Sequence, residues 1–155
     1  MSVEDKIKAS GLELPEPFAF PNPNRVGCVR VGNLLYVSGH PPAKQRGIMT
    51  EGKVEADVPE ADAVFTAQAC ALNMLASIKK EIGSLERIKR VVKINGMVNS
   101  SPGFIRQFAV IDGASDLFVT LFGLENGRHA RSAVGMAELP RNIPVEVEGV
   151  FELKE

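Results

Sequence analysis

The stretch RSAVGMAELPRNIPVEVEGVFEL, residues 131–153, carries the pattern that decides the fold. It predicts two strands, over 131–139 and 145–153, because a break between Pro140 and Pro144 separates two runs of strand-forming residues. Along the second strand, apolar residues alternate with residues that are mostly charged. Successive residues of a strand point to opposite faces. The sheet therefore has an apolar face, expected to carry helices, and a second face that carries charge.

The strand over 131–139 is expected to present one face of small residues that begins with a permanent cation. This face holds Arg131, Ala133, Gly135 and Ala137. We expect it to lie opposite the helices, together with the charged face of the last strand. Such a face either meets water or packs closely against another subunit, in which case the charges line a cleft between subunits.

A hairpin, two helices and a strand are predicted upstream of this stretch. They are a β-hairpin within 26–40 that turns at Gly32-Asn33, a helix over 58–84, a strand over 88–98 and a helix over 112–123. Gly83 is expected to stop the first helix, and Asp112 is the expected N-cap of the second. The order ββαβαββ predicts an α+β fold, with a mixed sheet and both helices on one face.

The N-terminal residues 1–25 are expected to form an arm on a single domain that spans 1–155. A short helix is predicted over 3–10. The segment 14–24 contains four prolines, which favour extended backbone. A chain of 155 residues is long enough for one ordinary domain with its own core.

Composition narrows the function classes. Hydrophobic residues make up 45% of the chain, and the formal net charge of −1 lacks the basic surplus of a general nucleic-acid binder. The N-terminus does not resemble a signal peptide, and no apolar run approaches the roughly 18 residues of a membrane span. We therefore expect a cytoplasmic protein that binds neither nucleic acid nor membrane.

The residues that usually hold metals or act as nucleophiles form no known signature. His40 and His129 are the only histidines, Cys28 and Cys70 lie far apart, and none has metal-ligand spacing. We expect no metal and two buried, reduced thiols. A Ser-His-Asp triad can be written down from Ser38 and either histidine, but no motif supports it.

Arg131 is the strongest candidate for a binding residue. Arginine stays charged and presents a planar fork that matches a carboxylate. At the start of a strand, between small neighbours, it can hold a small acid through two parallel hydrogen bonds. The structural alternative is an ion pair with Glu146 or Glu148 on the neighbouring strand.

Three blocks carry a resemblance to a known family: GNLLYVSGHPP (32–42), RSAVGMAELP (131–140) and VEVEGVFE (145–152). Together they resemble the YjgF/Rid (reactive intermediate deaminase) family, historically called endoribonuclease L-PSP, from about Val26 to Phe151. The resemblance implies a chorismate mutase-like fold and a homotrimer with three clefts between subunits. It implies hydrolysis of small 2-imino acids to 2-keto acids and ammonia, without a cofactor.

The resemblance also implies roles for individual residues. Arg131 matches the arginine that binds the substrate carboxylate, and Glu146 matches a glutamate that positions water in the same cleft. Ser38 and Gly39 match residues that line the pocket, and Ala133 matches a position in its wall.

Two positions depart from the family pattern. Arg25 stands where characterised deaminases carry a tyrosine, and is either a second anion contact or a surface charge. His40 replaces a glutamine, and is either a proton donor or a filler at the strand end. The missing tyrosine favours an alternative interpretation, a trimeric binder or sensor of small carboxylates without catalysis. The third interpretation is an endoribonuclease, which near-neutral charge and the lack of a paired acid and base disfavour.

Overall fold

A mixed five-stranded sheet forms one layer of the structure, a computed structural model that describes residues 1–155. Its strands are β1 (Cys28–Val31), β2 (Leu34–His40), β3 (Ile88–Asn99), β4 (Ala130–Met136) and β5 (Val145–Leu153). The strand order is β1-β2-β5-β3-β4, and β3 and β4 are the parallel pair. The predicted mixed sheet is confirmed, and β5 has the bounds that its alternation predicts.

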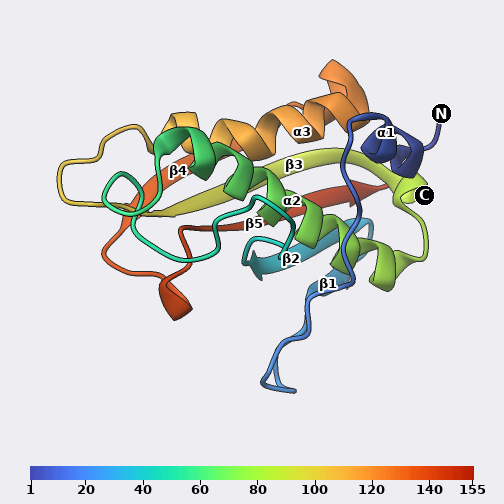
Figure 1. Ribbon diagram of the computed structural model, residues 1–155. Coiled ribbons are helices and arrows are strands. Elements are labelled where there is room, and N and C mark those ends of the chain that lie inside the picture. The colour runs from blue at the N-terminus through green and yellow to red at the C-terminus, as the bar shows by residue number, and fades with distance from the viewer.

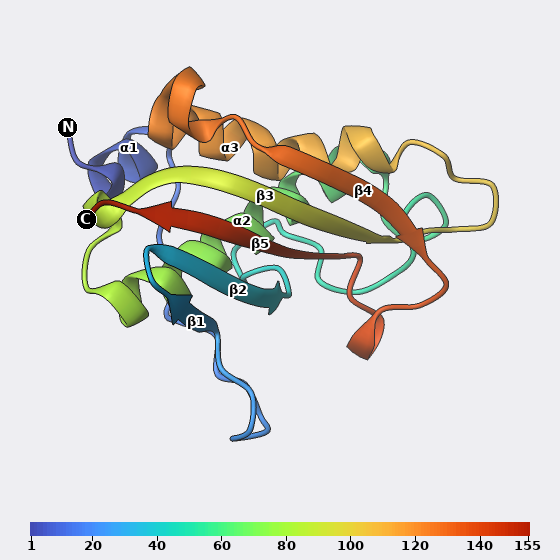
Figure 2. The ribbon, with the colours of Figure 1, turned by 180° about the vertical axis from the view of Figure 1, so that it is seen from behind.

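Two long helices, α2 (Glu60–Ile82) and α3 (Gln107–Gly127), lie side by side on one face of the sheet (Figure 1). The other face carries no helix, as the view from behind shows (Figure 2). The short helix α1 (Val3–Ala9) contacts α3 and begins at a capping box between Ser2 and Asp5. The order is therefore α1 followed by the predicted ββαβαββ, and both crossover helices share one face as expected.

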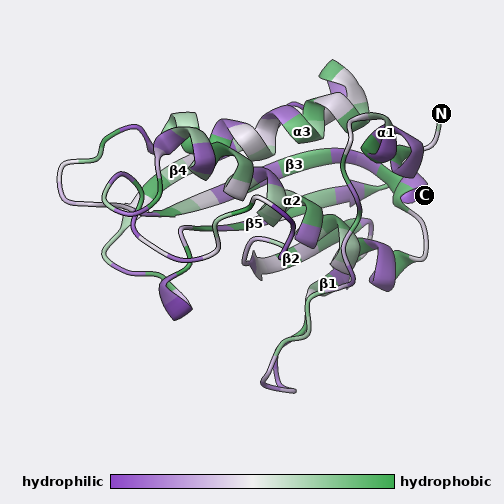
Figure 3. Ribbon diagram, viewed as in Figure 1, coloured by the Kyte–Doolittle hydropathy of each residue, from purple (hydrophilic) through white to green (hydrophobic).

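The core fills the space between the helices and the sheet. Its fully buried large side chains include Leu35, Ile94 and Phe151 from the sheet, Leu72, Leu75 and Ile78 from α2, and Ile111, Phe118 and Leu121 from α3. Hydrophobic and hydrophilic segments alternate along α2 (Figure 3), as expected for a helix with one face on a core. Gly83, with φ of +84°, ends α2 where the sequence predicts.

The start of α3 differs from the prediction. The helix begins at Gln107 rather than after Asp112, because the side chain of Gln107 donates to the Phe104 carbonyl and to Ser100 Oγ and so organises an earlier first turn. Asp112 thus lies inside the helix and does not cap it. The backbone breaks at Gly123, with φ of +80°, and the helix continues to Gly127.

The face of β4 that carries small residues points towards α3, which corrects the expectation that it lies opposite the helices. Arg131, Ala133 and Gly135 pair with Ile94, Gly96 and Val98 of β3, and both Ile94 and Val98 are fully buried in the core. Any side chain at Gly96 would overlap Ile111 of α3. The small residues therefore allow α3 to approach the sheet closely.

The helix-free face of the sheet is more apolar than the sequence suggests. Large hydrophobic side chains are exposed there, namely Val29 and Val31 of β1, Tyr36 of β2, and Val134 and Met136 of β4. Glu146 and Glu148 of β5 share this face, because their neighbours Val145 and Val147 are fully buried beneath the helices. This combination of apolar and charged groups resembles a protein contact surface more than a solvated sheet face.

Both long helices contain an apolar window that, by length and composition, could cross a membrane. This corrects the expectation that no apolar run approaches that length. About 72% of the window in α2 is buried inside the domain. The hydropathy of α2 is therefore explained by its packing on the sheet and against α3.

Candidate functional site

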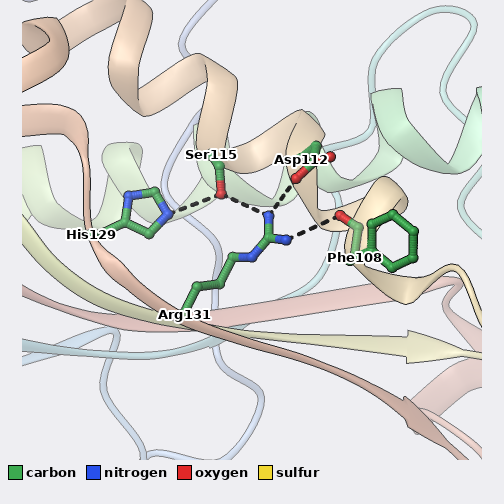
Figure 4. A network of polar contacts seen from close by, with 5 residues as sticks. All are labelled: Phe108, Asp112, Ser115, His129 and Arg131. Atoms are coloured by element: carbon green, nitrogen blue, oxygen red, sulfur yellow. Dashed lines mark hydrogen bonds and ion pairs between the residues drawn. The ribbon is translucent and has the colours of Figure 1, made fainter.

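Arg131 extends from β4 towards α3, where its guanidinium meets three acceptors (Figure 4). Nη1 donates to Asp112 Oδ1 at 2.7 Å and to Ser115 Oγ at 3.2 Å, and Nη2 donates to the Phe108 carbonyl at 3.3 Å. The side chain of Arg131 is 22% exposed and that of Asp112 is 50% exposed. The guanidinium is therefore held in place but open to solvent on the Asp112 side.

The ion pair of Arg131 is not the one expected from the sequence. Glu146 and Glu148 lie on the opposite face of the sheet from Arg131, so neither can pair with it within one chain. Asp112 takes that place because α3 starts early and presents its second turn to the edge strand. Three of the five N–H donors of the guanidinium are used, and Nε–H and one Nη2–H remain for a further acceptor.

Next to Arg131, Ser115 and His129 form a hydrogen-bonded pair that no sequence motif indicates. The Ser115 Oγ and His129 Nε2 atoms are 2.9 Å apart, and His129 Nδ1 lies 2.6 Å from the Gly127 carbonyl. Since a carbonyl only accepts, Nδ1 carries the ring proton and Nε2 accepts the Ser115 hydroxyl. Burial, followed by proximity to Arg131, lowers the pKa of His129, which keeps the ring neutral near pH 7.

Glu146 lies half-buried at the start of β5 and close to β2. Any side chain at Gly39 would overlap the Glu146 carboxylate, so the two positions are in direct contact. The carboxylate makes no hydrogen bond or ion pair with another side chain or with the backbone. Burial, and then the neighbouring Glu148, raise the pKa of Glu146. An unpaired carboxylate with a raised pKa is a common feature of functional sites.

Ser38 and His40 flank Gly39 but are engaged in the structure. Ser38 Oγ donates to the Val26 carbonyl at 2.6 Å and so ties the residues just before β1 to β2. His40 has no exposed surface, and its ring nitrogens lie 2.6 Å from the Ser38 carbonyl and 2.7 Å from Ser77 Oγ. Burial lowers the pKa of His40. His40 thus has the place of a strand-end filler, the structural alternative for this residue.

The N-terminal arm anchors on His40 and then leaves the body of the domain. The rings of Phe18 and Phe20 contact the His40 ring edge-on. The segment that precedes β1 extends away from the sheet (Figures 1 and 2). Arg25 lies in this segment, exposed and without a side-chain hydrogen bond. No hydrogen bond or ion pair joins its side chain to Arg131, Glu146 or Ser38.

The predicted site residues therefore form two groups. Arg131 and Ala133 lie on the edge strand β4 and face α3, whereas Ser38, Gly39 and Glu146 lie where β2 meets β5, nearer the other edge. Glu146 and Arg131 are on opposite faces of the sheet, so a single chain does not bring the two groups together.

The two cysteines and the potential metal ligands do not form a site. Cys28 and Cys70 are buried and free, as predicted, and burial raises the pKa of Cys28 to about 12. No three His, Cys, Asp or Glu side chains of the structure gather closely enough to hold a metal ion.

The mixed sheet with both crossover helices on one face is the topology of the chorismate mutase-like α+β domains. The chain belongs to the YjgF family: residues 4–151 match the family model described as "YjgF/chorismate mutase-like, putative endoribonuclease". It is 42% identical to Protein TCP17 of Trypanosoma cruzi over 97% of this chain and 94% of that one. It is 33% identical to the 2-iminobutanoate/2-iminopropanoate deaminase of Dermatophagoides farinae, over 82% and 84% respectively.

Solved structures share the architecture. Atu1372 from Agrobacterium tumefaciens, a protein of unknown function, superposes with a TM-score of 0.89 at 44% identity, over 98% of this chain and 92% of that one. TdcF of E. coli, crystallised with bound serine, superposes with a TM-score of 0.57 at 20% identity, over 92% and 94%. The latter likeness concerns the fold alone.

Proposed function

We propose that the protein is an imine and enamine deaminase that hydrolyses small 2-imino acids to 2-keto acids and ammonia. The observation that carries the proposal is Arg131, a partly exposed guanidinium beside the small side chain of Ala133. It has two free N–H donors and a half-exposed partner, Asp112, that a ligand carboxylate can displace. The deaminase of Dermatophagoides farinae supports it, as a relative that covers most of the chain.

A homotrimer would join the two groups of site residues. The strands β1 and β4 are the two edges of the sheet, and the helix-free face between them exposes apolar side chains such as Tyr36 and Val134. Burying this face against other copies removes apolar surface from water. In such an assembly, Arg131 of one subunit and Glu146 of the next face a shared cleft, and the protruding segment with Arg25 can reach the neighbouring subunit.

The chemistry needs no cofactor and no metal. A 2-imino acid is already electrophilic at C2, so the site has to hold its carboxylate and bring water to that carbon. Arg131 holds the carboxylate through charged hydrogen bonds. Glu146 brings the water, because an unpaired carboxylate can accept a hydrogen bond from water and orient it. The natural ligand is then a small acid in the cytoplasm and not a nucleic acid.

One observation favours a second candidate, a trimeric carboxylate binder or sensor without turnover. The tyrosine expected before the first strand is absent, and the only tyrosine, Tyr36, lies exposed on the helix-free face. Binding would then use the same residues without a reaction.

The two candidates are separated by one assay. 2-Iminobutyrate is generated in situ, and ammonia and 2-ketobutyrate are measured with the native chain and with Arg131→Ala. Turnover that Arg131→Ala abolishes supports the deaminase. Binding of 2-ketobutyrate in calorimetry without any turnover supports the sensor. The absence of both binding and turnover would exclude both candidates.

A further inference from the structure

The hydrogen bonds that join Arg131, Ser115 and His129 have a fixed donor-to-acceptor order. His129 Nδ1 donates to the Gly127 carbonyl, so Nε2 must accept, and its donor is the Ser115 hydroxyl. Arg131 Nη1 in turn donates to Ser115 Oγ. The hydroxyl proton of Ser115 therefore points at a base, while its oxygen faces a cation (Figure 4). Both contacts reduce the cost of removing a proton from Ser115.

Ser115 lies beside the place where a ligand carboxylate would bind. Asp112 Oδ1 and Ser115 Oγ accept from the same nitrogen of Arg131, at 2.7 and 3.2 Å. A small acid that replaces the half-exposed Asp112 can use Nη1 and the free hydrogen on Nη2, and then has the Ser115 hydroxyl as its neighbour. In a 2-imino acid the reacting carbon is bonded directly to the carboxylate. The hydroxyl is therefore next to the reacting centre.

We propose that Ser115 is a catalytic residue of this site, whose hydroxyl passes protons between the substrate and His129, the base behind it. His129 acts through Ser115 and is a positioning and proton-accepting residue. The proposal rests on the proposed deaminase function and deepens it, since it supplies the proton transfers that Arg131 and Glu146 leave unassigned.

The proton transfers balance over one turnover. Water adds to C2 of the protonated imine, forming the C–O bond, while the π electrons move to nitrogen. The proton lost by water goes to Ser115 Oγ as the hydroxyl proton goes to His129 Nε2. The imidazolium then returns its proton through Ser115 to the amine nitrogen. The C–N bond breaks with its electron pair on ammonia, the carbinol oxygen becomes the keto oxygen, and its proton leaves with ammonia as ammonium.

Charged groups surround His129. Arg131 follows it at the start of β4 and pairs with Asp112 of α3, while Arg90, Arg128 and Glu152 border a surface pocket together with His129. Burial and the Arg131 charge lower the pKa of the ring below its usual value of about 6.5. The base is therefore neutral and competent at neutral pH, and kcat/KM should fall on the acid side as His129 becomes protonated.

The test compares Ser115→Ala and His129→Gln with the native protein. The glutamine amide keeps an acceptor for the Ser115 hydroxyl but cannot take up a proton. Both variants should lower kcat for 2-iminobutyrate by about 100-fold or more, while 2-ketobutyrate binds within about threefold of native. The acid-side break in the pH profile of kcat/KM should disappear in His129→Gln. Thr120→Ala, which removes an exposed hydroxyl on the same helix, is the matched control and should keep native kcat.

The outcomes separate this inference from the proposed function. Thermal melts of both variants confirm that each is folded, and His129→Gln remains informative where Ser115→Ala is unstable. An active native chain whose folded variants keep full kcat and an unchanged pH profile would overturn the role of Ser115 alone. A native chain that binds 2-ketobutyrate but turns over no imine would overturn both this role and the deaminase.

Discussion

Arg131 and Glu146 lie on opposite faces of one sheet, with Arg131 turned to α3 and Glu146 turned to the helix-free face. A ligand held by the guanidinium therefore cannot reach the carboxylate of the same chain. Any function that uses both residues requires a second copy of the chain.

Replacing Arg131 tests the carboxylate contact. Arg131→Ala should weaken the binding of 2-ketobutyrate by about 30- to 1000-fold, the cost of a charged hydrogen-bond pair in a partly desolvated site. Arg131→Lys should restore little, because an ammonium cannot reproduce the fork. Isothermal titration measures the affinity. Variants that melt earlier yet bind the keto acid as the native chain does would show that the ion pair with Asp112 is the whole role of Arg131.

Assembly is tested on the helix-free face. Light scattering after size exclusion should give a mass of about three times 16.7 kDa. Val134→Glu places a charge among the exposed apolar residues of this face and should yield monomers at micromolar concentration. Ile105→Glu, at an exposed apolar position in the loop before α3, is the control and should leave the mass unchanged. A native chain that is a monodisperse monomer would rule out the shared cleft.

Asp112 competes with an incoming acid for the same guanidinium nitrogen. Asp112→Asn removes this negative charge and should tighten 2-ketobutyrate binding by roughly 2- to 5-fold, the scale of a partly exposed ion pair. Titration at low and high salt should show that the gain shrinks as salt rises. Weaker binding would instead show that Asp112 orients Arg131 for its ligand.

Glu146→Gln should separate stability from activity. The pKa of Glu146 is raised in the folded chain, so its ionised form disfavours folding above the usual pKa of the residue. The variant should therefore unfold at a higher temperature than the native chain at pH 7, with no difference near pH 3. Turnover should fall by about 100-fold or more, because the water is no longer oriented. An equal or lower melting temperature at pH 7 would contradict the role of burial.

The buried His40 should make the fold sensitive to mild acid. Burial lowers its pKa in the folded chain, so the unfolded chain binds more protons below the usual pKa of about 6.5. Together with His129, whose pKa is lowered in the same direction, His40 should make the free energy of unfolding decrease as the pH falls through 6 towards 5. Urea titrations across this range measure it. A flat profile between pH 7 and 5 would mean that the ring is protonated in the core.

The sequence predicts where the helices and strands lie more accurately than which way their side chains point. The alternation of β5 and the stop at Gly83 depend on local chemistry, and both are confirmed. The direction of Arg131 depends on which way the edge strand β4 meets β3, and a strand pattern alone does not specify it. The same holds for Ser115 and His129, which are brought together by the packing of β4 against α3. The sequence points to Asp112 as the helix cap, because the earlier turn at Gln107 has no conventional capping residue.

The separation of Arg131 from Glu146 also predicts how defective subunits behave in mixtures. In the proposed trimer, a homotrimer of Arg131→Ala or of Glu146→Gln has no intact cleft, because every interface lacks one of the two residues. A mixed trimer of the two contains one interface that takes Arg131 from one parent and Glu146 from the other, and so regains both. With random assembly of equal amounts, about a quarter of native activity should return when two inactive preparations are unfolded together and refolded. Two copies of the gene, each inactive, would complement one another in the same cell.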